Sequence, residues 1–354
     1  MKLQQIEQKS IRVLASRNGR NAAVYYRMQA PLSVCAYRWG IEAELKRPDV
    51  GDAETFDVLW LQQPTSSHEL IVARQFKERG GIVIVDCDDF LPALPPSWPC
   101  YSNYFNNAEA RRTLLYHKMT VDVADCLTVP TDEMAQAVAE SDFYGIDGGK
   151  VHVLPNCVLA GDWDTLLPTG HNVQGQVVGW FGTDNHWDDL QEIVLAVDEA
   201  LEETGASLAI LGYPDVVGSF PDRMKERTYV HLPVDINRDF KNMRRMIMAF
   251  DLGIAWCTDR LTTNRLRSPL KALQYGAAGV PVVASRAVYG ALSDFSGLVV
   301  DSPADLTEKI VWALGEGKAQ MRERANRWNG EVMKRHTYET QAHRWLDLVN
   351  ELMG

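Results

Sequence analysis

Residues 268–285 read SPLKALQYGAAGVPVVAS, and this stretch carries the signals of a helix followed by a strand. Ser268 and Pro269 are typical of an N-cap and a first helical residue, and the helix should end near Gly276 to Gly279. The run VPVVAS is short, apolar and rich in valine, which favours a buried strand. A helix that leads into such a strand is a building unit of parallel α/β sheets.

Apolar runs of the same kind recur along the whole chain, separated by segments of helical character. In the first half they are IRVLAS (11–16), residues 41–45, FDVLWLQQP (56–64), GIVIVDCDD (81–89), CLTVPTD (126–132) and KVHVLPN (150–156). In the second half they are QVVGWFGT (176–183), SLAILGY (207–213), TYVHLPV (228–234), LGIAWC (252–257), VPVVAS (280–285) and GLVVD (297–301). This rhythm predicts an α/β protein with parallel sheets.

A chain of 354 residues suits two domains, and the two series of runs divide it accordingly. We expect two doubly wound Rossmann-like domains that face a cleft, because ligands of open parallel sheets bind beyond the carboxyl ends of the strands. The expected N-terminal domain covers 1–157 and the C-terminal domain 176–335. Residues 158–175, with few apolar anchors, should form the linker, and 336–354 a helix that packs back on the body.

Composition limits the classes of function. The net charge of -11 argues against a protein that coats nucleic acid through its overall field. The N-terminal residues MKLQQIEQKSIRVLAS show no unbroken apolar stretch of signal-peptide length, and no later run approaches about 18 apolar residues, so we expect a cytoplasmic protein. Its six cysteines are scattered without a zinc-finger spacing, which favours buried free thiols over a metal site.

The window from residue 260 to residue 293 is cationic in an acidic protein. It holds four Arg and one Lys but no Asp or Glu, although the whole chain has 47 acidic and 36 basic residues. Lys271 falls in the first turn of the expected helix and Arg267 just before it, where free backbone N–H groups and the helix dipole favour an anion. Both cations suit a diphosphate. The competing interpretation is a pair of solvated surface charges.

A family resemblance rests on these residues. SPLKALQYGAAGVPVVAS resembles the donor-binding helix and strand of GT-B glycosyltransferases of group 1, the family-4-like members, whose pattern runs Pro-Leu-x-x-Leu-Glu-x-x-Ala-x-Gly-x-Pro-Val-Val. KVHVLPN is similar to the segment that closes the family's first domain, and VVGWFGT to the first strand of its second. The resemblance implies a hexosyl- or pentosyltransferase that moves a sugar from a UDP- or GDP-sugar to a hydroxyl acceptor without a bound metal. A phage-type member is included in that expectation.

The resemblance makes the C-terminal domain the nucleotide-sugar domain and the N-terminal one the acceptor side. It places the donor at Gly182, Thr183, Arg267, Ser268, Lys271 and Gln274. The sequence departs from the family pattern at two places. Leu266 and Gln274 replace the family's glutamate pair. The segment GTDNHWDDL lacks the Arg and Lys that many retaining members carry there. The Gln274 amide can still bind ribose hydroxyls, and the stereochemistry of transfer stays open.

Catalytic candidates lie at other strand ends. His186, after VVGWFGT, is a candidate donor to a phosphate or sugar oxygen, or else a surface histidine. Asp88 and Asp89, after GIVIVD, are candidates for the general base that faces the acceptor, with a structural capping role as the alternative. Their spacing also resembles the Asp-x-Asp metal motif of the GT-A fold, an interpretation that we discount.

The loop after the first strand offers a further phosphate site. Asn18 and Gly19 would let the backbone approach the sugar, and Arg27 is a candidate second phosphate clamp, with an ordinary helix-surface charge as the alternative.

The acceptor is open at this stage. A glycan is the leading hypothesis, and a hydroxymethylated base in phage DNA is the alternative, which would make the protein a DNA-modifying enzyme that flips its target base. A second alternative is a non-catalytic GT-B scaffold that binds nucleotide.

Overall fold

The computed structural model describes residues 10–16, 22–164, 166–169, 175–212, 214–231, 240–290 and 292–354. Two candidates from the sequence, Asn18 and Gly19, lie outside these ranges. Among the described residues, no helix is both long enough and apolar enough to cross a membrane.

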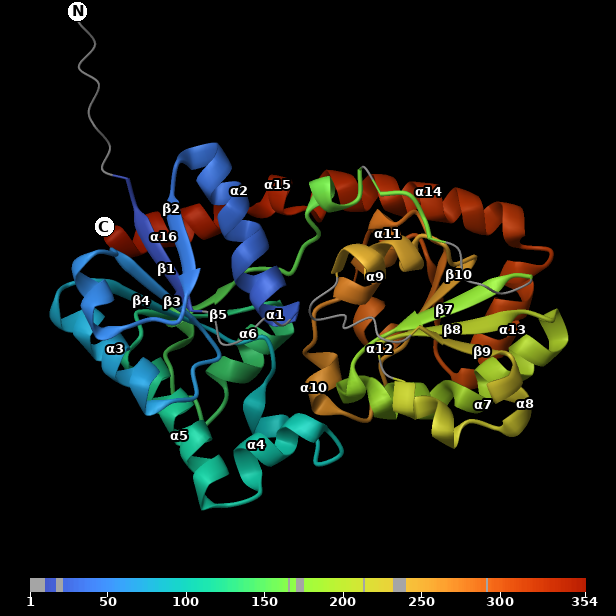
Figure 1. The fold of residues 1–354 in the computed structure, drawn as a ribbon, viewed down its shortest axis with the longest axis horizontal. Coiled ribbons are helices and arrows are strands. Elements are labelled where there is room, and N and C mark those ends of the chain that lie inside the picture. The colour runs from blue at the N-terminus through green and yellow to red at the C-terminus, as the bar shows by residue number, and fades with distance from the viewer. Residues whose placement is uncertain are drawn as a thin grey trace, which may run out of the picture. The chain divides into compact units, whose positions relative to one another are not determined.

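The strands form two parallel six-stranded sheets, which confirms the predicted fold class of two helix-flanked α/β units (Figure 1). The first sheet has the order β2-β1-β3-β4-β5-β6 and the second the order β12-β11-β10-β7-β8-β9. Those of the first sheet are β1 (Arg12–Ser16), β2 (Glu42–Lys46), β3 (Val58–Gln62), β4 (Ile82–Asp86), β5 (Cys126–Val129) and β6 (Val151–Val153). Those of the second are β7 (Val177–Phe181), β8 (Ser207–Leu211), β9 (Thr228–His231), β10 (Leu252–Ala255), β11 (Val282–Ser285) and β12 (Leu298–Val300). Eleven of the twelve lie wholly within runs that the sequence predicts, and β2 extends one residue beyond its predicted run, to Lys46.

Helices connect successive strands. Up to residue 162 they are α1 (Ala22–Val24), η1 (Tyr25–Gln29), α2 (Ala30–Trp39), η2 (Val50–Glu54), α3 (Ser67–Glu78), η3 (Leu91–Ala93), η4 (Pro99–Tyr101), α4 (Ser102–Phe105), α5 (Ala108–Val123), α6 (Asp132–Ala139), η5 (Gly148–Lys150) and η6 (Ala160–Asp162). From residue 184 they are η7 (Asp184–His186), α7 (Trp187–Thr204), η8 (Pro214–Ser219), α8 (Asp222–Glu226), α9 (Phe240–Ile247), α10 (Thr262–Arg265), α11 (Leu270–Ala277), α12 (Arg286–Tyr289), α13 (Pro303–Leu314), α14 (Lys318–Arg335), α15 (Tyr338–Gln341) and α16 (His343–Met353).

The chain divides into two compact units that do not follow the sequence in one cut. Unit 1 comprises Met1–Asp88, Arg112–Leu154 and Ala342–Gly354, and unit 2 comprises Asp89–Arg111 and Pro155–Gln341. Within unit 1, α16 returns to the body of the unit and buries Trp345, Leu348 and Val349. In the stretch expected as a linker, Val158 and Trp163 belong to a buried core of unit 2.

Unit 2 is a three-layer sandwich. One face of its sheet packs against α9, α11 and α14, and the other against α7, α8 and α13 (Figure 1). Two strand glycines let large aromatic rings approach the sheet: a Cβ at Gly179 would lie 1.9 Å from Phe250, and one at Gly253 would lie 2.4 Å from Tyr275. The Tyr275 hydroxyl donates to the Gly179 carbonyl at 2.9 Å, which fixes α11 on β7.

Candidate functional site

A cluster of buried polar side chains in unit 2 lies where its strand order reverses. Strands β7 and β10 are neighbours, and from them the chain runs outward in opposite directions, to β8 and β9 on one side and to β11 and β12 on the other. Such a reversal is the usual binding crevice of a doubly wound sheet. The chain that follows β7 carries His186, and the chain that follows β10 carries Arg267 and Lys271.

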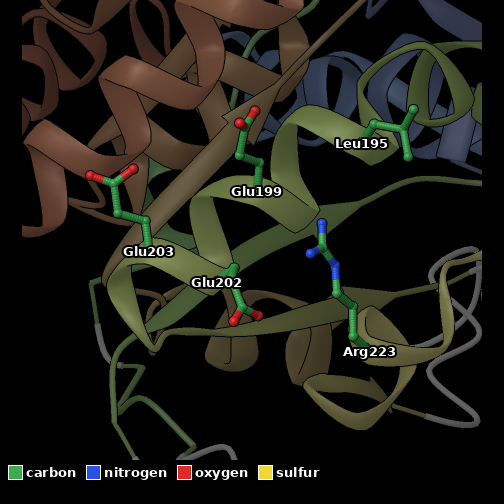
Figure 2. Close-up of a pocket in the computed structure, with 5 residues that line it drawn as sticks. All are labelled: Leu195, Glu199, Glu202, Glu203 and Arg223. Carbon is green, nitrogen blue, oxygen red and sulfur yellow. The ribbon is translucent and has the colours of Figure 1, made fainter.

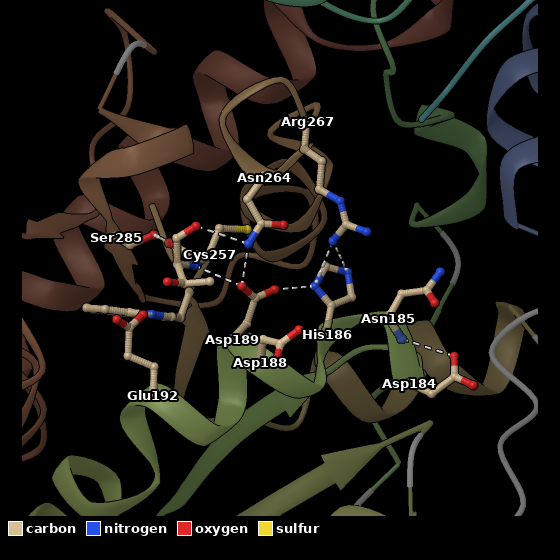
Figure 3. Close-up of polar contacts among 12 residues, drawn as sticks. Asp184, Asn185, His186, Asp188, Asp189, Glu192, Cys257, Asn264, Arg267 and Ser285 are labelled. Atoms are coloured by element: carbon tan, nitrogen blue, oxygen red, sulfur yellow. Dashed lines mark hydrogen bonds and ion pairs between the residues drawn. The ribbon is translucent and has the colours of Figure 1, made fainter. Parts of the chain in front are cut away.

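Asp189 is the hub of this cluster (Figure 3). Its side chain lies in the first turn of α7 and is 1% exposed. One carboxylate oxygen accepts from the Thr258 backbone N–H at 2.8 Å and from the Asn264 amide at 2.7 Å. The other lies 2.7 Å from Nδ1 of His186. Burial alone would raise the pKa of Asp189, but the hydrogen bond from His186 and the charges of nearby cations lower it, so Asp189 is ionised.

His186 connects Asp189 to Arg267. Since Asp189 is an acceptor, Nδ1 of His186 carries the proton. Nη1 of Arg267 lies 3.0 Å from Nδ1 and 3.1 Å from Nε2 of this ring (Figure 3), and of the two nitrogens only Nε2 can then accept from it. Burial, together with the charges of Lys271 and Arg267, lowers the pKa of His186 to about 3. The ring is therefore neutral. In this tautomer His186 has no proton left for a phosphate, and its contact orients Arg267 instead.

Lys271 is the unusual charge of the site. It occupies the second position of α11 and is 8% exposed, although the sequence offers a solvated surface charge as an interpretation. Its ammonium stands 5.0 Å from the Trp180 ring centroid and 5.8 Å from that of Phe181. Among the residues that the structure describes, none accepts a hydrogen bond from it. Burial lowers its pKa. A buried ammonium without an acceptor is costly, and an anionic ligand would complete it.

The remaining donor-side candidates line the same strand ends. The helix begins one residue later than the sequence predicts: Pro269 is its N-cap, and the buried Ser268 hydroxyl caps nothing and has no partner among the described residues. Gly182 is held close to the rings below it, since a Cβ there would lie 2.7 Å from Trp180. Thr183 precedes η7 as its N-cap. Gln274 is 3% exposed within α11.

Arg27 lies elsewhere, inside unit 1. Its side chain is fully buried, with Nη2 2.6 Å from an Asp86 carboxylate oxygen, and Nη1 donates to the Leu154 carbonyl. Thr128 also donates to Asp86, at 2.7 Å. A guanidinium enclosed in this way serves the core of unit 1, so we leave Arg27 out of the donor site.

The two aspartates predicted as bases follow β4 and are both half-buried. Asp88 is the last residue of the first segment of unit 1, and Asp89 is the first residue of unit 2. No group of three or more His, Cys, Asp or Glu side chains in the described part of the chain is placed to hold a metal ion.

A surface cavity on unit 2 has the wrong charge for the same ligand. It measures about 410 Å³ and is lined by Leu195, Glu199, Glu202, Glu203 and Arg223 (Figure 2). The guanidinium of Arg223 is already 2.7 Å from Asp198. Three carboxylates would repel a diphosphate, so this cavity is not the donor site.

Three residues of the site were not predicted from the sequence: Asp189, Asn264 and Trp98. Asp189 lies in the segment GTDNHWDDL. Comparison with the family pattern shows there that an Arg and a Lys are missing, but it does not single out this carboxylate. Asn264 has no signal beyond its place in the cationic window. Trp98 belongs to a segment far away in the sequence, yet its ring centroid lies 4.3 Å from the Arg267 guanidinium.

No protein-family model and no curated protein matches the chain by sequence. Solved structures do match its fold. The complex of Anabaena HepE with UDP is 12% identical, with 97% of this chain and 100% of that chain covered and a TM-score of 0.64. An alpha-glucosyltransferase in complex with UDP-glucose and DNA containing an abasic site is 12% identical, with coverages of 96% and 99% and a TM-score of 0.66. The apo form of the lipopolysaccharide outer core galactosyltransferase WaaB is 10% identical, with coverages of 96% and 99% and a TM-score of 0.52.

At this level of identity the likeness concerns the fold. The chain has the GT-B architecture over nearly its whole length, which confirms the resemblance that its sequence suggests, and it shares this fold with enzymes that transfer sugars.

Proposed function

We propose that the protein is a glycosyltransferase that binds a nucleoside-diphosphate sugar at the β7/β10 edge of unit 2 and transfers the sugar to a hydroxyl acceptor. The observation that carries this proposal is Lys271, a buried ammonium with no acceptor among the described residues, at the N-terminal end of α11. Structures of similar fold are bound to UDP or UDP-glucose, which makes a uridine nucleotide the first one to test.

In this proposal Lys271 and Arg267 act on the leaving group. Negative charge grows on the diphosphate as the glycosidic bond to the sugar breaks, and two cations already fixed in a dry site stabilise it without reorganisation. Ionised Asp189 holds His186 in one tautomer, and His186 in turn holds Arg267. Ser268, Gly182 and Thr183 complete the phosphate edge, and Gln274 takes the ribose.

We propose that unit 1 binds the acceptor and that Asp88, or the adjacent Asp89, is the general base. A glycan is the first acceptor to test because the chain is acidic overall, with a net charge of -11. A hydroxymethylated base in DNA is the second, since a structure of similar fold holds UDP-glucose and DNA together.

The test measures nucleotide release from a panel of UDP- and GDP-sugars, with glycans, hydroxymethylated DNA and unmodified DNA as separate acceptors. Release with glycans supports the leading proposal, and release with hydroxymethylated but not unmodified DNA supports the second. Lys271→Met is the matched inactive control, because it removes the charge and keeps the side-chain length.

Two further outcomes decide against an enzyme. Tight nucleotide binding without release in any arm would identify a non-catalytic scaffold, the alternative that rests on the replacement of the family's glutamates by Leu266 and Gln274. No binding of any nucleotide by calorimetry would refute the donor site itself.

A further inference from the structure

A segment from the N-terminal half of the chain packs beside the candidate donor site. Asp89–Arg111, here called the 89–111 segment, belongs to unit 2, although the chain on both sides of it, up to Asp88 and from Arg112, belongs to unit 1. It contains η3, η4 and α4. Its only Lys or Arg is its last residue, Arg111.

Two hydrogen bonds fasten the 89–111 segment at the site. The Ser97 hydroxyl donates to the Asp188 carboxylate at 2.6 Å, in the first turn of α7. The Thr263 hydroxyl of α10 donates to the Ala93 carbonyl, also at 2.6 Å. Both partners are close in sequence to residues of the Asp189 cluster, so the segment is held beside that cluster from two sides.

Trp98 directly follows Ser97 in the chain and is 2% exposed. Its ring centroid is 4.3 Å from the central carbon of the Arg267 guanidinium, a distance at which a cation is attracted to the ring face. Nη1 of Arg267 is also 3.0 Å from Nδ1 and 3.1 Å from Nε2 of the His186 ring. The guanidinium is therefore fixed by two contacts of different kinds.

This arrangement leaves part of Arg267 for a ligand. An arginine has five N–H groups in a planar fork. Among the described residues, the one side-chain nitrogen of Arg267 with a hydrogen-bond partner is Nη1, which contacts His186. A flexible arginine loses rotamer freedom when it binds a phosphate, whereas one already fixed loses little. Stacking on Trp98 thus prepares the remaining N–H groups for an anion.

We infer that Trp98 is a positioning residue of the donor site: it fixes the Arg267 guanidinium for the diphosphate, and the 89–111 segment is part of the nucleotide-binding apparatus. This inference rests on the proposed function, because the ligand that Arg267 meets is the nucleoside diphosphate. It assigns to Trp98 no contact with the reacting atoms.

The test is a double-mutant cycle on nucleotide affinity. UDP, GDP, ADP, CDP and dTDP are first titrated into the wild-type protein by calorimetry, and the tightest binder is used. Its Kd is then measured for Trp98→Leu, Arg267→Gln and the double variant. Loss of the cation–π contact should raise Kd about tenfold in the Trp98→Leu variant. In the Arg267→Gln background the same change should have almost no effect, because the guanidinium that Trp98 positions is gone.

Trp98→Phe and Trp345→Leu are the controls. Trp98→Phe keeps an aromatic face, so its Kd should rise only about threefold above the wild-type value. If the leucine variant unfolds at the assay temperature, Trp98→Phe takes its place in the cycle. Trp345, 1% exposed in α16 of unit 1, is an equally buried tryptophan whose loss should leave Kd unchanged.

The outcomes separate the two proposals. If the wild type binds a nucleotide and Arg267→Gln weakens it, but Trp98→Leu changes Kd equally in both backgrounds or not at all, the role of Trp98 is wrong and the proposed function stands. If no nucleotide of the panel binds the wild type, both are overturned.

Discussion

The substitution Lys271→Met separates a binding role from a structural one. Lys271 is 8% exposed, its ammonium has no acceptor among the described residues, and burial lowers its pKa. Methionine keeps an unbranched stem of similar length and removes the charge. The folded protein should therefore tolerate the change well.

The expected magnitudes follow from these contacts. Desolvation of a buried ion costs several kcal/mol, and the contact with the Trp180 ring returns up to about 2 kcal/mol of that cost. Attraction to nearby Asp189 returns part of the remainder. We expect the free energy of unfolding to rise by about 1 kcal/mol. Loss of charged hydrogen bonds to a diphosphate, worth about 1.5–3 kcal/mol, should raise Kd roughly 10- to 100-fold.

Urea unfolding followed by circular dichroism measures the first quantity, and calorimetric titration with the tightest nucleoside diphosphate measures the second. Lys334→Met is the matched control, because Lys334 is an exposed lysine near the end of α14 in the same unit, and it should change neither. A loss of more than about 2 kcal/mol of stability together with an unchanged Kd would identify Lys271 as a structural cation and rule out its role in binding the diphosphate.

Three other perturbations have distinct signatures. Asp86→Asn should lower the free energy of unfolding by about 3–5 kcal/mol in a urea titration, because Arg27 would keep a buried charge without its partner, while nucleotide affinity stays unchanged. Gly182→Ala should weaken nucleotide binding at nearly unchanged secondary structure by circular dichroism, because the new Cβ would lie 2.7 Å from Trp180, the ring that supports Lys271; wild-type affinity would contradict this. The pKa of His186 is about 3 in the folded protein against 6.5 ordinarily, so the unfolded chain binds the extra proton between these values and stability should fall as pH drops from 6.5 towards 3. His186→Gln should make that fall shallower in a pH series of urea titrations, and an equally steep fall would show that His186 does not contribute.

The strands and their order along the chain can be predicted from local sequence patterns alone. Eleven of the twelve strands lie wholly within predicted runs, and those buried on both faces, such as β4 and β7, need consecutive apolar residues whatever their neighbours are. Helix α11 was placed to within one residue at its start, since proline and glycine limit a helix locally. The same local argument placed Arg267 and Lys271 together at one helix terminus.

Sequence did not determine burial or partnership between distant residues. Lys271 and Arg27 are both cations near candidate phosphate sites, and only tertiary structure tells them apart. The ammonium of Lys271 lies beside aromatic rings and has no acceptor in the part of the chain that the structure describes, whereas Arg27 is neutralised by Asp86, 59 residues further along the chain. Charge type is a property of the residue, but its partner is chosen by packing.

Trp98 is the clearest case of a role that only the fold assigns. It contacts Arg267 across a long separation in sequence, because the 89–111 segment leaves unit 1 and packs on unit 2. The residue pattern along the chain indicates which side chains lie on one face of a helix or strand. Which side chains contact one another depends on how the segments pack, because their apolar surfaces must be buried together. This packing gives Arg267 and Lys271 their neighbours in the candidate site.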